Sequence, residues 1–235
     1  MRVGLIQSNY IPWRGYFDVI HDVDVFVFHD DLQYTKGDWR NRNFIKTPTG
    51  PQWLTIPVGT SEHRLICEVP LPDSDWAVRH WRRLEQHYAR APHFGRYRDL
   101  LRHHYFGCGY ESLSAFNQGL TMAIARDVLG IRTRFRDSRE FRVSGVKSQR
   151  VLDLVSQAGA STYVSGPAAR AYIEEAAFDA AGIALQWKDY DGYPDYPQFH
   201  PPFAGRVSIL DLIFHAGPDA GWFVWGWRDG VRRAA

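Results

Sequence analysis

Two short apolar runs near the start of the chain, residues 3–6 and 25–28, each end abruptly in polar side chains. Apolar runs of this length are typical of strands that are buried on both faces of a parallel sheet. The polar side chains that follow such strands lie at the carboxyl edge of the sheet, where open α/β proteins bind their ligands. The sequence therefore predicts a parallel arrangement in which residues 5–43 form the floor of a binding or catalytic site.

Strand and helix patterns alternate along the rest of the chain. Strands are expected at residues 2–7, 23–28, 52–58, 66–70, 131–135, 161–164 and 183–187. Helices are expected at residues 16–21, 73–88, 94–105, 113–129, 147–158, 168–181 and 208–215. This order predicts an α/β fold with a Rossmann-like three-layer core, in which helices cover both faces of a parallel or mixed sheet. We expect a single domain over residues 1–235, either undivided or built from two closely packed halves, about 1–140 and 141–235.

The composition narrows the classes of protein to which the chain can belong. A hydrophobic fraction of 45% argues for a folded globular protein and against disorder. The net charge of +2 is too small to imply a nucleic-acid partner. The chain has no apolar run near the roughly 20 residues that span a bilayer, and no signal-peptide pattern at its start, so we expect a cytoplasmic protein without membrane contact. Cys67 and Cys108 are too few and too far apart for a disulfide framework.

The segment after the second apolar run contains the strongest catalytic candidates, His29, Asp30 and Asp31. Adjacent carboxylates beside an imidazole suit general acid–base catalysis or direct contact with a substrate. They would also suit Mg²⁺, but no further ligand can be assigned elsewhere in the chain, so no metal or other cofactor is predicted. A capping or turn role is the remaining alternative.

The turn after the first apolar run offers Gln7, Asn9 and Tyr10 as substrate contacts. A strand, a polar turn and a helix that opens at a glycine leave free backbone amides for a phosphate or carboxylate. Nucleotidyltransferases of the cytidylyltransferase type place a His-x-Gly-His motif here, whereas this chain has Trp13-Arg14-Gly15-Tyr16. The missing histidines argue against nucleotidyl transfer. A turn whose aromatic side chains only pack is the structural alternative.

A third group of substrate-binding candidates lies between residues 33 and 43. Amides at these positions are suited to fixing the orientation of a ligand, and an arginine fork matches carboxylate or phosphate. A solvated charged loop is the alternative. The candidates are Gln33, Lys36, Trp39, Asn41, Arg42 and Asn43.

Two further helix starts favour an anionic ligand. Lys147 and Arg150 lie in the first turn of a predicted helix, where basic side chains oppose the helix dipole unless an anion is bound. Ser165 precedes Gly166-Pro167, where a proline begins the next predicted helix. The arginines at 132, 134 and 136 alternate along a strand and are expected to form a solvated sheet edge, with an RNA-binding stripe as the weaker alternative.

The order of these motifs resembles the WbqC-like protein family, over about residues 5–217. The matching residues are Gln7, Tyr10, Pro12, Trp13, Gly15, Tyr16, Phe17, Asp30, Asp31, Gln33, Tyr34, Lys36, Trp39, Asn41, Arg42, Asn43, Gly145, Lys147, Arg150, Tyr163, Ser165, Gly166, Leu210, Asp211 and Leu212. Ile6 and Ser8 stand where the family pattern has His or Met and Pro. A histidine-dependent step is then either absent here or carried by His29.

The resemblance implies modification of a sugar or small molecule, since the family is associated with surface-polysaccharide and specialised-metabolite gene sets and its members are described as glycine or acyl transferases. We therefore expect a transferase that makes an amide or ester link on a small-molecule acceptor. Asp30 or Asp31 would orient or deprotonate the acceptor amine. The activated donor would be a carrier-protein thioester, an aminoacyl-tRNA, an acyl-CoA or a nucleotide, with no other nucleic-acid partner. A non-catalytic protein that binds a nucleotide or an intermediate for a partner enzyme is the alternative.

Overall fold

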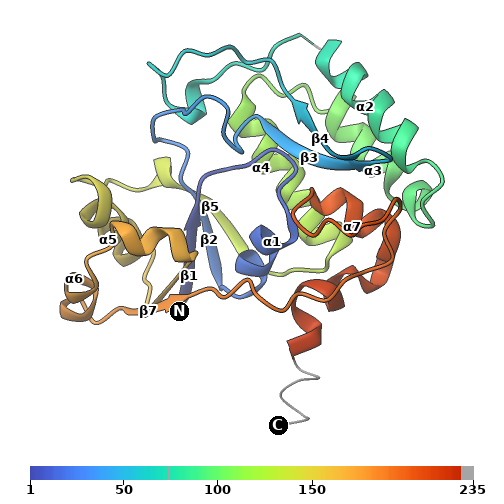
Figure 1. The fold of residues 1–235 in the computed structure, drawn as a ribbon. Coiled ribbons are helices and arrows are strands. Elements are labelled where there is room, and N and C mark those ends of the chain that lie inside the picture. Colours follow the sequence, from blue (N-terminus) through green and yellow to red (C-terminus); the bar gives the residue numbers. More distant parts are fainter. Residues whose placement is uncertain (74, 229–235) are drawn as a thin grey trace.

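A five-stranded parallel sheet forms the centre of the molecule (Figure 1). The computed structural model describes residues 1–73 and 75–228. The strands lie in the order β5-β2-β1-β6-β7 and every neighbouring pair is parallel, which confirms the predicted α/β class. Their bounds are β1 (Arg2–Ile6), β2 (Val25–Phe28), β5 (Arg134–Asp137), β6 (Thr162–Ser165) and β7 (Ala184–Trp187).

The sheet contains strands from both halves of the chain. β1 pairs with β2 on one side and with β6 on the other, so strands from both predicted halves of the chain share one sheet. Along the chain, β2 and then β5 are added on one side of β1, and β6 and then β7 are added on the other side afterwards. The carboxyl ends of β1 and β6 are therefore the topological switch point, where sheets of this kind bind ligands.

Alternation along β2 separates the two covered faces of the sheet. Phe26 and Phe28 pack with the helices on one face, and Val25 and Val27 pack with those on the other. The first face is covered by α1 (Arg14–His21) and α4 (Leu113–Ala123), and the second by α5 (Lys147–Gln157) and α6 (Glu175–Ala180). The structure thus confirms the three-layer core with helices on both faces.

A second group of elements packs against α4, on the side of the sheet that α1 covers. It consists of the antiparallel hairpin β3 (Arg42–Thr47) and β4 (Gly50–Thr55), with α2 (Asp75–Tyr88), α3 (Phe94–Phe106) and α7 (Ile209–Ala216). The fully buried carboxyl of Asp211 on α7 accepts hydrogen bonds from Tyr88 Oη at 2.9 Å and Tyr196 Oη at 2.8 Å. These bonds tie the C-terminal part of the chain to α2.

Tertiary contacts shift several predicted elements. The expected strand at residues 66–70 is instead a short 3₁₀ turn, Ile66–Glu68, in which the Glu68 carboxylate accepts from the Leu65 amide at 2.8 Å. The expected helix at residues 168–181 is broken into a 3₁₀ turn and α6. The break lies at Glu174, whose amide donates to Ser148 Oγ on α5 at 2.9 Å. The expected helix at residues 113–129 ends in a π-helical turn, Ile124–Val128.

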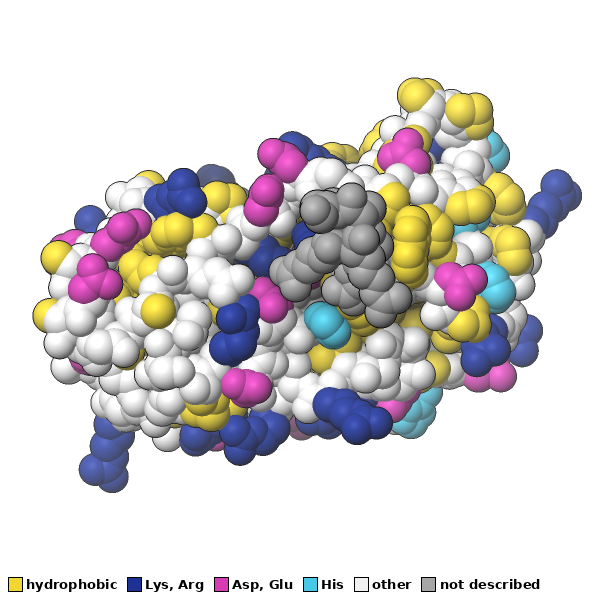
Figure 2. Space-filling view, turned by 90° about the horizontal axis from the view of Figure 1, so that it is seen from below, with side chains coloured by type: hydrophobic (Ala, Val, Ile, Leu, Met, Phe, Trp, Pro, Cys, Tyr) yellow, Lys and Arg dark blue, Asp and Glu magenta, His cyan; other side chains and the backbone are white. Residues whose placement is uncertain are grey.

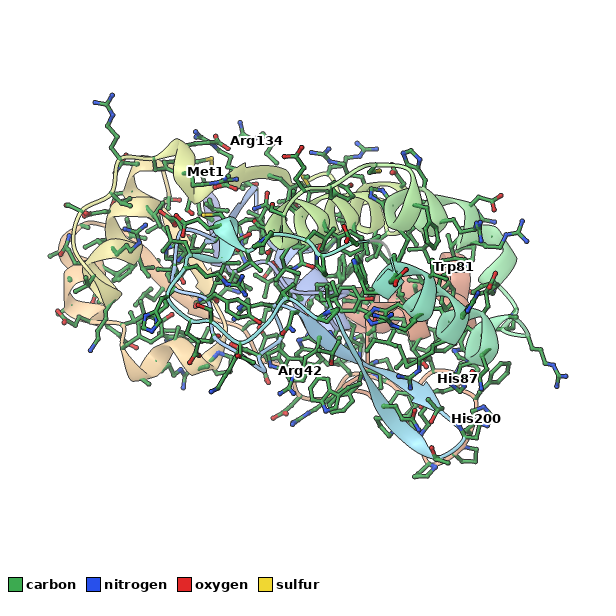
Figure 3. The ribbon with its side chains drawn as sticks, turned by 90° about the horizontal axis from the view of Figure 1, so that it is seen from above. Met1, Arg42, Trp81, His87, Arg134 and His200 are labelled. Carbon is green, nitrogen blue, oxygen red and sulfur yellow. The ribbon has the colours of Figure 1, made fainter. Side chains whose placement is uncertain are left out.

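Two arginines of the predicted stripe, Arg134 and Arg136, lie on β5, which is an edge strand of the sheet, and Arg132 precedes this strand. Arg136 pairs with Glu140 at 2.7 Å, and Figure 3 shows Arg134 beside Met1, far from Arg42. Basic and acidic side chains are interspersed over the face seen in Figure 2. This placement fits the solvated sheet edge.

Within residues 1–73 and 75–228, no helix combines the length and the apolar character needed to cross a bilayer.

A buried network joins the first turn to the helices around it. His80 on α2 accepts from Tyr10 Oη through Nδ1 at 2.7 Å and contacts the Thr55 carbonyl through Nε2 at 3.1 Å. Tyr10 Oη also lies 2.5 Å from Tyr105 Oη on α3. Because burial lowers the pKa of His80 to about 4, the ring is neutral near pH 7.

This network predicts a pH-dependent stability. Between pH 6.5 and about 4, His80 is mostly protonated in the unfolded state and mostly neutral in the folded state. The free energy of unfolding therefore falls as the pH falls through this range. From about pH 6.5 to about pH 5, we expect the wild type to lose about 1.5 kcal/mol more than His80→Gln, whose amide preserves one donor and one acceptor. Urea unfolding at several pH values measures this difference, and identical pH slopes would contradict it.

Candidate active site at the carboxyl edge of the sheet

A cavity of about 300 Å³ opens at the carboxyl ends of β1, β2 and β6, at the topological switch point of the sheet. We call it the His29 cavity. Its volume lies at the lower end of the range for small-molecule sites. It is lined by Leu5, Ile6, Gln7, His29, Leu32, Lys147, Arg150, Val151, Tyr163 and Tyr172. The structure thus brings together four predicted site residues from both halves of the chain: Gln7, His29, Lys147 and Arg150.

His29 is a buried imidazole in the lining of this cavity. Its backbone amide donates to the Ile6 carbonyl at 3.1 Å, which fixes it directly after β2, and its Nε2 accepts from Arg150 Nε at 3.2 Å. Burial lowers the pKa of His29 to about 4, with Asp31 opposing this shift and Arg150 adding to it. The ring is therefore neutral at pH 7, and its bond to Arg150 places the proton on Nδ1.

Asp31 holds the arginine of the cavity in place. Its carboxylate accepts from Ser138 Oγ at 2.5 Å and forms an ion pair with Arg150 Nη2. Burial raises the pKa of Asp31, but the hydrogen bonds from Ser138 and Arg150 outweigh it and hold the pKa below its ordinary value. A carboxylate with a lowered pKa is a weak base. Of the two roles expected of Asp31, orienting and deprotonating, its contacts with Ser138 and Arg150 support the orienting one.

Lys147 lies at the mouth of the cavity in a strained backbone conformation. It is the first residue of α5, is exposed, and has a φ of 50°. A residue other than glycine is costly in the left-handed region, and such residues cluster at functional sites. Lys147 and Arg150 thus give the His29 cavity two basic side chains at the start of one helix, as the sequence predicts.

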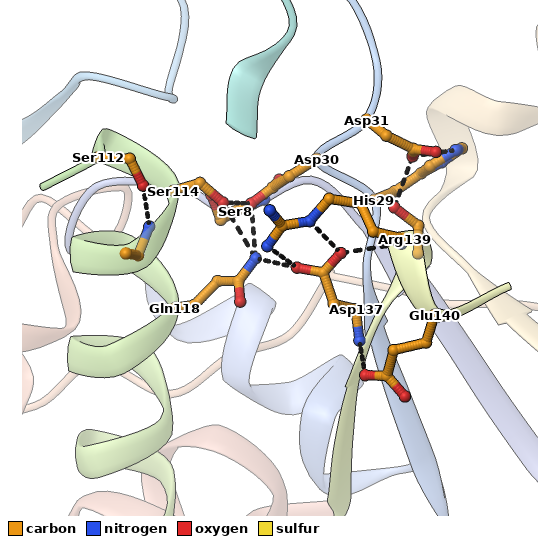
Figure 4. A network of polar contacts seen from close by, with 12 residues as sticks. Ser8, His29, Asp30, Asp31, Ser112, Ser114, Gln118, Asp137, Arg139 and Glu140 are labelled. Carbon is orange, nitrogen blue, oxygen red and sulfur yellow. Dashed lines mark hydrogen bonds and ion pairs between the residues drawn. The ribbon is translucent and has the colours of Figure 1, made fainter. Parts of the chain in front are cut away.

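Asp30 is fully buried and does not line the His29 cavity. Its fully buried carboxyl accepts from the Ser8 amide at 2.7 Å, from Gln118 Nε2 at 2.9 Å and from Ser114 Oγ (Figure 4). Gln118 also donates to Asp137 at 2.9 Å, which links the network to β5. These contacts correct the catalytic assignment of Asp30: it positions the turn after β1 against α4.

A second cavity of about 340 Å³ adjoins the same turn. We call it the aromatic cavity. It is lined by Asn9, Pro12, Trp13, Trp39, Asn43, Tyr190, Asp191 and Arg206. Gln7 lines the His29 cavity and Asn9 the aromatic cavity, so the segment that Asp30 holds at Ser8 contributes to both. Tyr190 and Arg206 were not among the residues predicted from the sequence. The richness of residues 189–202 in proline and tyrosine was the available signal for Tyr190, whereas Arg206 lies outside that range.

Tyr10 and Asn41, which were predicted to contact the substrate, make hydrogen bonds inside the protein. Tyr10 is fully buried in the network with His80, and Asn41 donates to the Ile56 carbonyl at 2.8 Å from a buried position. Asn43 lines the aromatic cavity, but its Nδ2 donates to the carbonyls of Tyr10 and Ile11 at 3.1 and 2.9 Å. Burial therefore places Tyr10 and Asn41 in the interior. Their hydrogen bonds to protein groups occupy Tyr10 Oη and Asn41 Nδ2, whereas Asn41 Oδ1 has no hydrogen-bond partner among the described residues.

Four other candidates lie outside both cavities. Gln33 and Lys36 are exposed, and the Arg42 guanidinium lies over the Trp53 ring at 4.1 Å. Ser165 is buried at the end of β6, where its carbonyl accepts from the Lys188 amide at 2.7 Å. The part of the chain that the structure describes contains no cluster of three His, Cys, Asp or Glu side chains arranged to hold a metal ion.

The Asp30 network predicts a loss of stability on mutation. Asp30→Asn replaces an acceptor oxygen with a donor, so the Ser8 amide, Ser114 or Gln118 loses its partner inside the protein. We expect the free energy of unfolding to fall by about 2 kcal/mol, the usual cost of an unsatisfied buried group. The exposed Asp191→Asn should change it by less than about 0.5 kcal/mol. Equal effects of the two substitutions in urea unfolding would contradict the assignment.

Comparison with known proteins agrees with the motif pattern. The family model described as the WbqC-like protein family matches residues 7–222. The chain is also 48% identical over 221 residues to the uncharacterized protein Rv1507c of Mycobacterium tuberculosis (strain ATCC 25618 / H37Rv), in an alignment that covers 93% of this chain and 95% of that protein. No solved structure matches the chain. The family match extends from Gln7 at the His29 cavity to residue 222 near the C-terminus, and the chain belongs to the WbqC-like protein family.

Proposed function

We propose that this protein is a transferase that forms an amide or ester link on a sugar or small-metabolite scaffold, by glycyl, aminoacyl or acyl transfer. The observation that carries the proposal is a neutral histidine, His29, beside Arg150 and Lys147 in one cavity at the switch point. The two basic side chains suit the anionic part of an activated donor. The neutral imidazole suits the removal of a proton from an acceptor amine or hydroxyl.

Donor binding would prepare His29 for this role. An anionic group on the donor would compete with His29 for the Nε–H of Arg150, which Asp31 keeps in place. Loss of that hydrogen bond leaves Nε2 free to accept a proton. The added negative charge also raises the pKa of the imidazole from about 4 toward the range in which histidine is an effective base at neutral pH.

The chemical step is then an ordinary acyl transfer. The acceptor nitrogen or oxygen attacks the acyl carbonyl, a C–N or C–O bond forms, and the bond from that carbonyl to the leaving group breaks. The acceptor's proton passes to His29 Nε2 and from there to the leaving group. Carrier-protein thioesters, aminoacyl-tRNAs, acyl-CoAs and nucleotide-activated acids all supply such a leaving group, and each carries the anionic groups that Lys147 and Arg150 would bind.

This mechanism predicts that His29→Gln lowers turnover by about 10²-fold or more, because the amide cannot accept the proton. Mass spectrometry of the acylated acceptor, with each donor class in turn, measures the effect. His63→Gln, an exposed histidine outside both cavities, should retain wild-type turnover. Full activity in His29→Gln would remove this residue from the mechanism.

Asp31→Asn tests the positioning role. We expect a folded protein whose turnover falls by about 10²-fold, because Arg150 loses its ion pair with Asp31 and no longer holds the donor in register. The KM for the donor should rise together with the loss of kcat, whereas the KM for the acceptor should not change. Unchanged kinetics for both substrates would exclude the role assigned to Asp31.

The second candidate function is a non-catalytic protein that binds a nucleotide or intermediate for a partner enzyme. It is favoured by one observation: no serine or cysteine nucleophile is among the residues that line the His29 cavity. Thermal-shift measurements with nucleotides, acyl-CoAs and amino acids test it, since a ligand at 100 times its dissociation constant stabilises by about 2.7 kcal/mol. Binding that is lost in Lys147→Ala, without turnover by the wild type, would favour this function over the transferase.

A further inference from the structure

The aromatic cavity has the walls of a ring-binding site. Trp13 and Tyr190 meet at a ring separation of 5.2 Å and an interplanar angle of 66°, so their faces form a corner and not a parallel slot. Trp39 lines the same cavity and is 42% exposed. An exposed tryptophan at the mouth of a concave site offers a large apolar face to a ligand at little cost in conformational entropy.

The polar groups of this cavity include charges of both signs. Asp191 and Arg206 are exposed, and neither forms an ion pair with another described residue. Asn9 Oδ1 accepts from the buried Arg40, which orients the side chain and leaves its amide NH₂ as a donor. A charged ligand would be attracted by one of Asp191 and Arg206 and repelled by the other. A neutral ligand that carries several hydroxyls can bond to both.

The walls are held in place by buried contacts behind them. The buried carboxylate of Asp18 on α1 pairs with Lys188 Nζ at 2.8 Å and Arg228 Nη2 at 2.9 Å, and it accepts from Tyr193 Oη. These bonds fasten to α1 the segment that carries Tyr190 and Asp191. The Asn43 hydrogen bonds to the Tyr10 and Ile11 carbonyls and the backbone bridge between Trp13 and Ser208 hold the wall that the first turn contributes. The cavity is thus preformed, which lowers the entropic cost of binding.

We propose that the aromatic cavity binds a neutral polyhydroxylated ring of the pyranose type. One apolar face of the ring would stack on the exposed Trp39, and its hydroxyls would donate to Asp191 and accept from Arg206 and Asn9. The Gln7–Ser8–Asn9 segment then separates this ring from the donor in the His29 cavity. That the ring is the acceptor of the transfer rests on the proposed function, whereas binding itself does not.

Titration of the intact protein with methyl pyranosides in the gluco, galacto, manno and rhamno series, followed by ligand-observed NMR without any donor, tests this site. We expect saturable binding of at least one pyranoside. Trp39→Ala should raise the dissociation constant by about tenfold or more, because it removes the stacking face. Trp222→Ala, which removes a tryptophan that is 52% exposed outside the cavity, should leave the dissociation constant unchanged.

Salt and competing ligands test the class of ligand. The dissociation constant of a neutral ring should not change with ionic strength, whereas that of a charged ligand would. Saturable binding of adenosine, uridine or choline without any pyranoside would overturn the proposal, as would pyranoside binding that Trp39→Ala leaves intact. His29→Gln should bind pyranosides as the wild type does. Pyranoside binding without turnover would therefore contradict the transferase and leave this site standing.

Discussion

The carboxyl group of Asp30 is the contact on which the rest of the site depends. It is fully buried at the end of β2, and it accepts from the Ser8 amide after β1 and from Ser114 and Gln118 on α4. A buried acceptor with three donors is stable only while all of them keep their places. Because Ser8 lies between the residues that line the two cavities, this single group sets the geometry of both.

Neighbouring residues of one motif have different environments and therefore different roles. Asp30 faces the interior, Asp31 faces Arg150, and His29 faces the cavity. Burial lowers the pKa of His80 as it does that of His29, and both are about 4. His80, however, is enclosed by Tyr10 and Thr55. A neutral imidazole thus contributes to packing at His80, whereas at His29 it is available to a ligand.

The two cavities also depend on segments that return late in the chain. α5 brings Lys147 and Arg150 to the carboxyl end of β1, and the segment fastened to Asp18 brings Tyr190 and Asp191 to the turn after it. Both segments reach these positions because of the sheet order: β2 and β5 are added on one side of β1 first, and β6 and then β7 are added on its other side later in the chain. This order therefore places two cavities on either side of one turn.

The sequence by itself determined the α/β class, most helices and strands, and the motif that contains His29, since apolar runs and helical spacing are local patterns. It did not determine β3 or the 3₁₀ turn Ile66–Glu68, where tertiary contacts outweigh propensity. Only the tertiary structure separated His29 and Arg150 at the cavity from Tyr10, Asp30 and Asn41 in the interior. All five belong to polar motifs, and which polar group meets solvent depends on partners distant in the sequence, such as His80, Gln118 and Ile56.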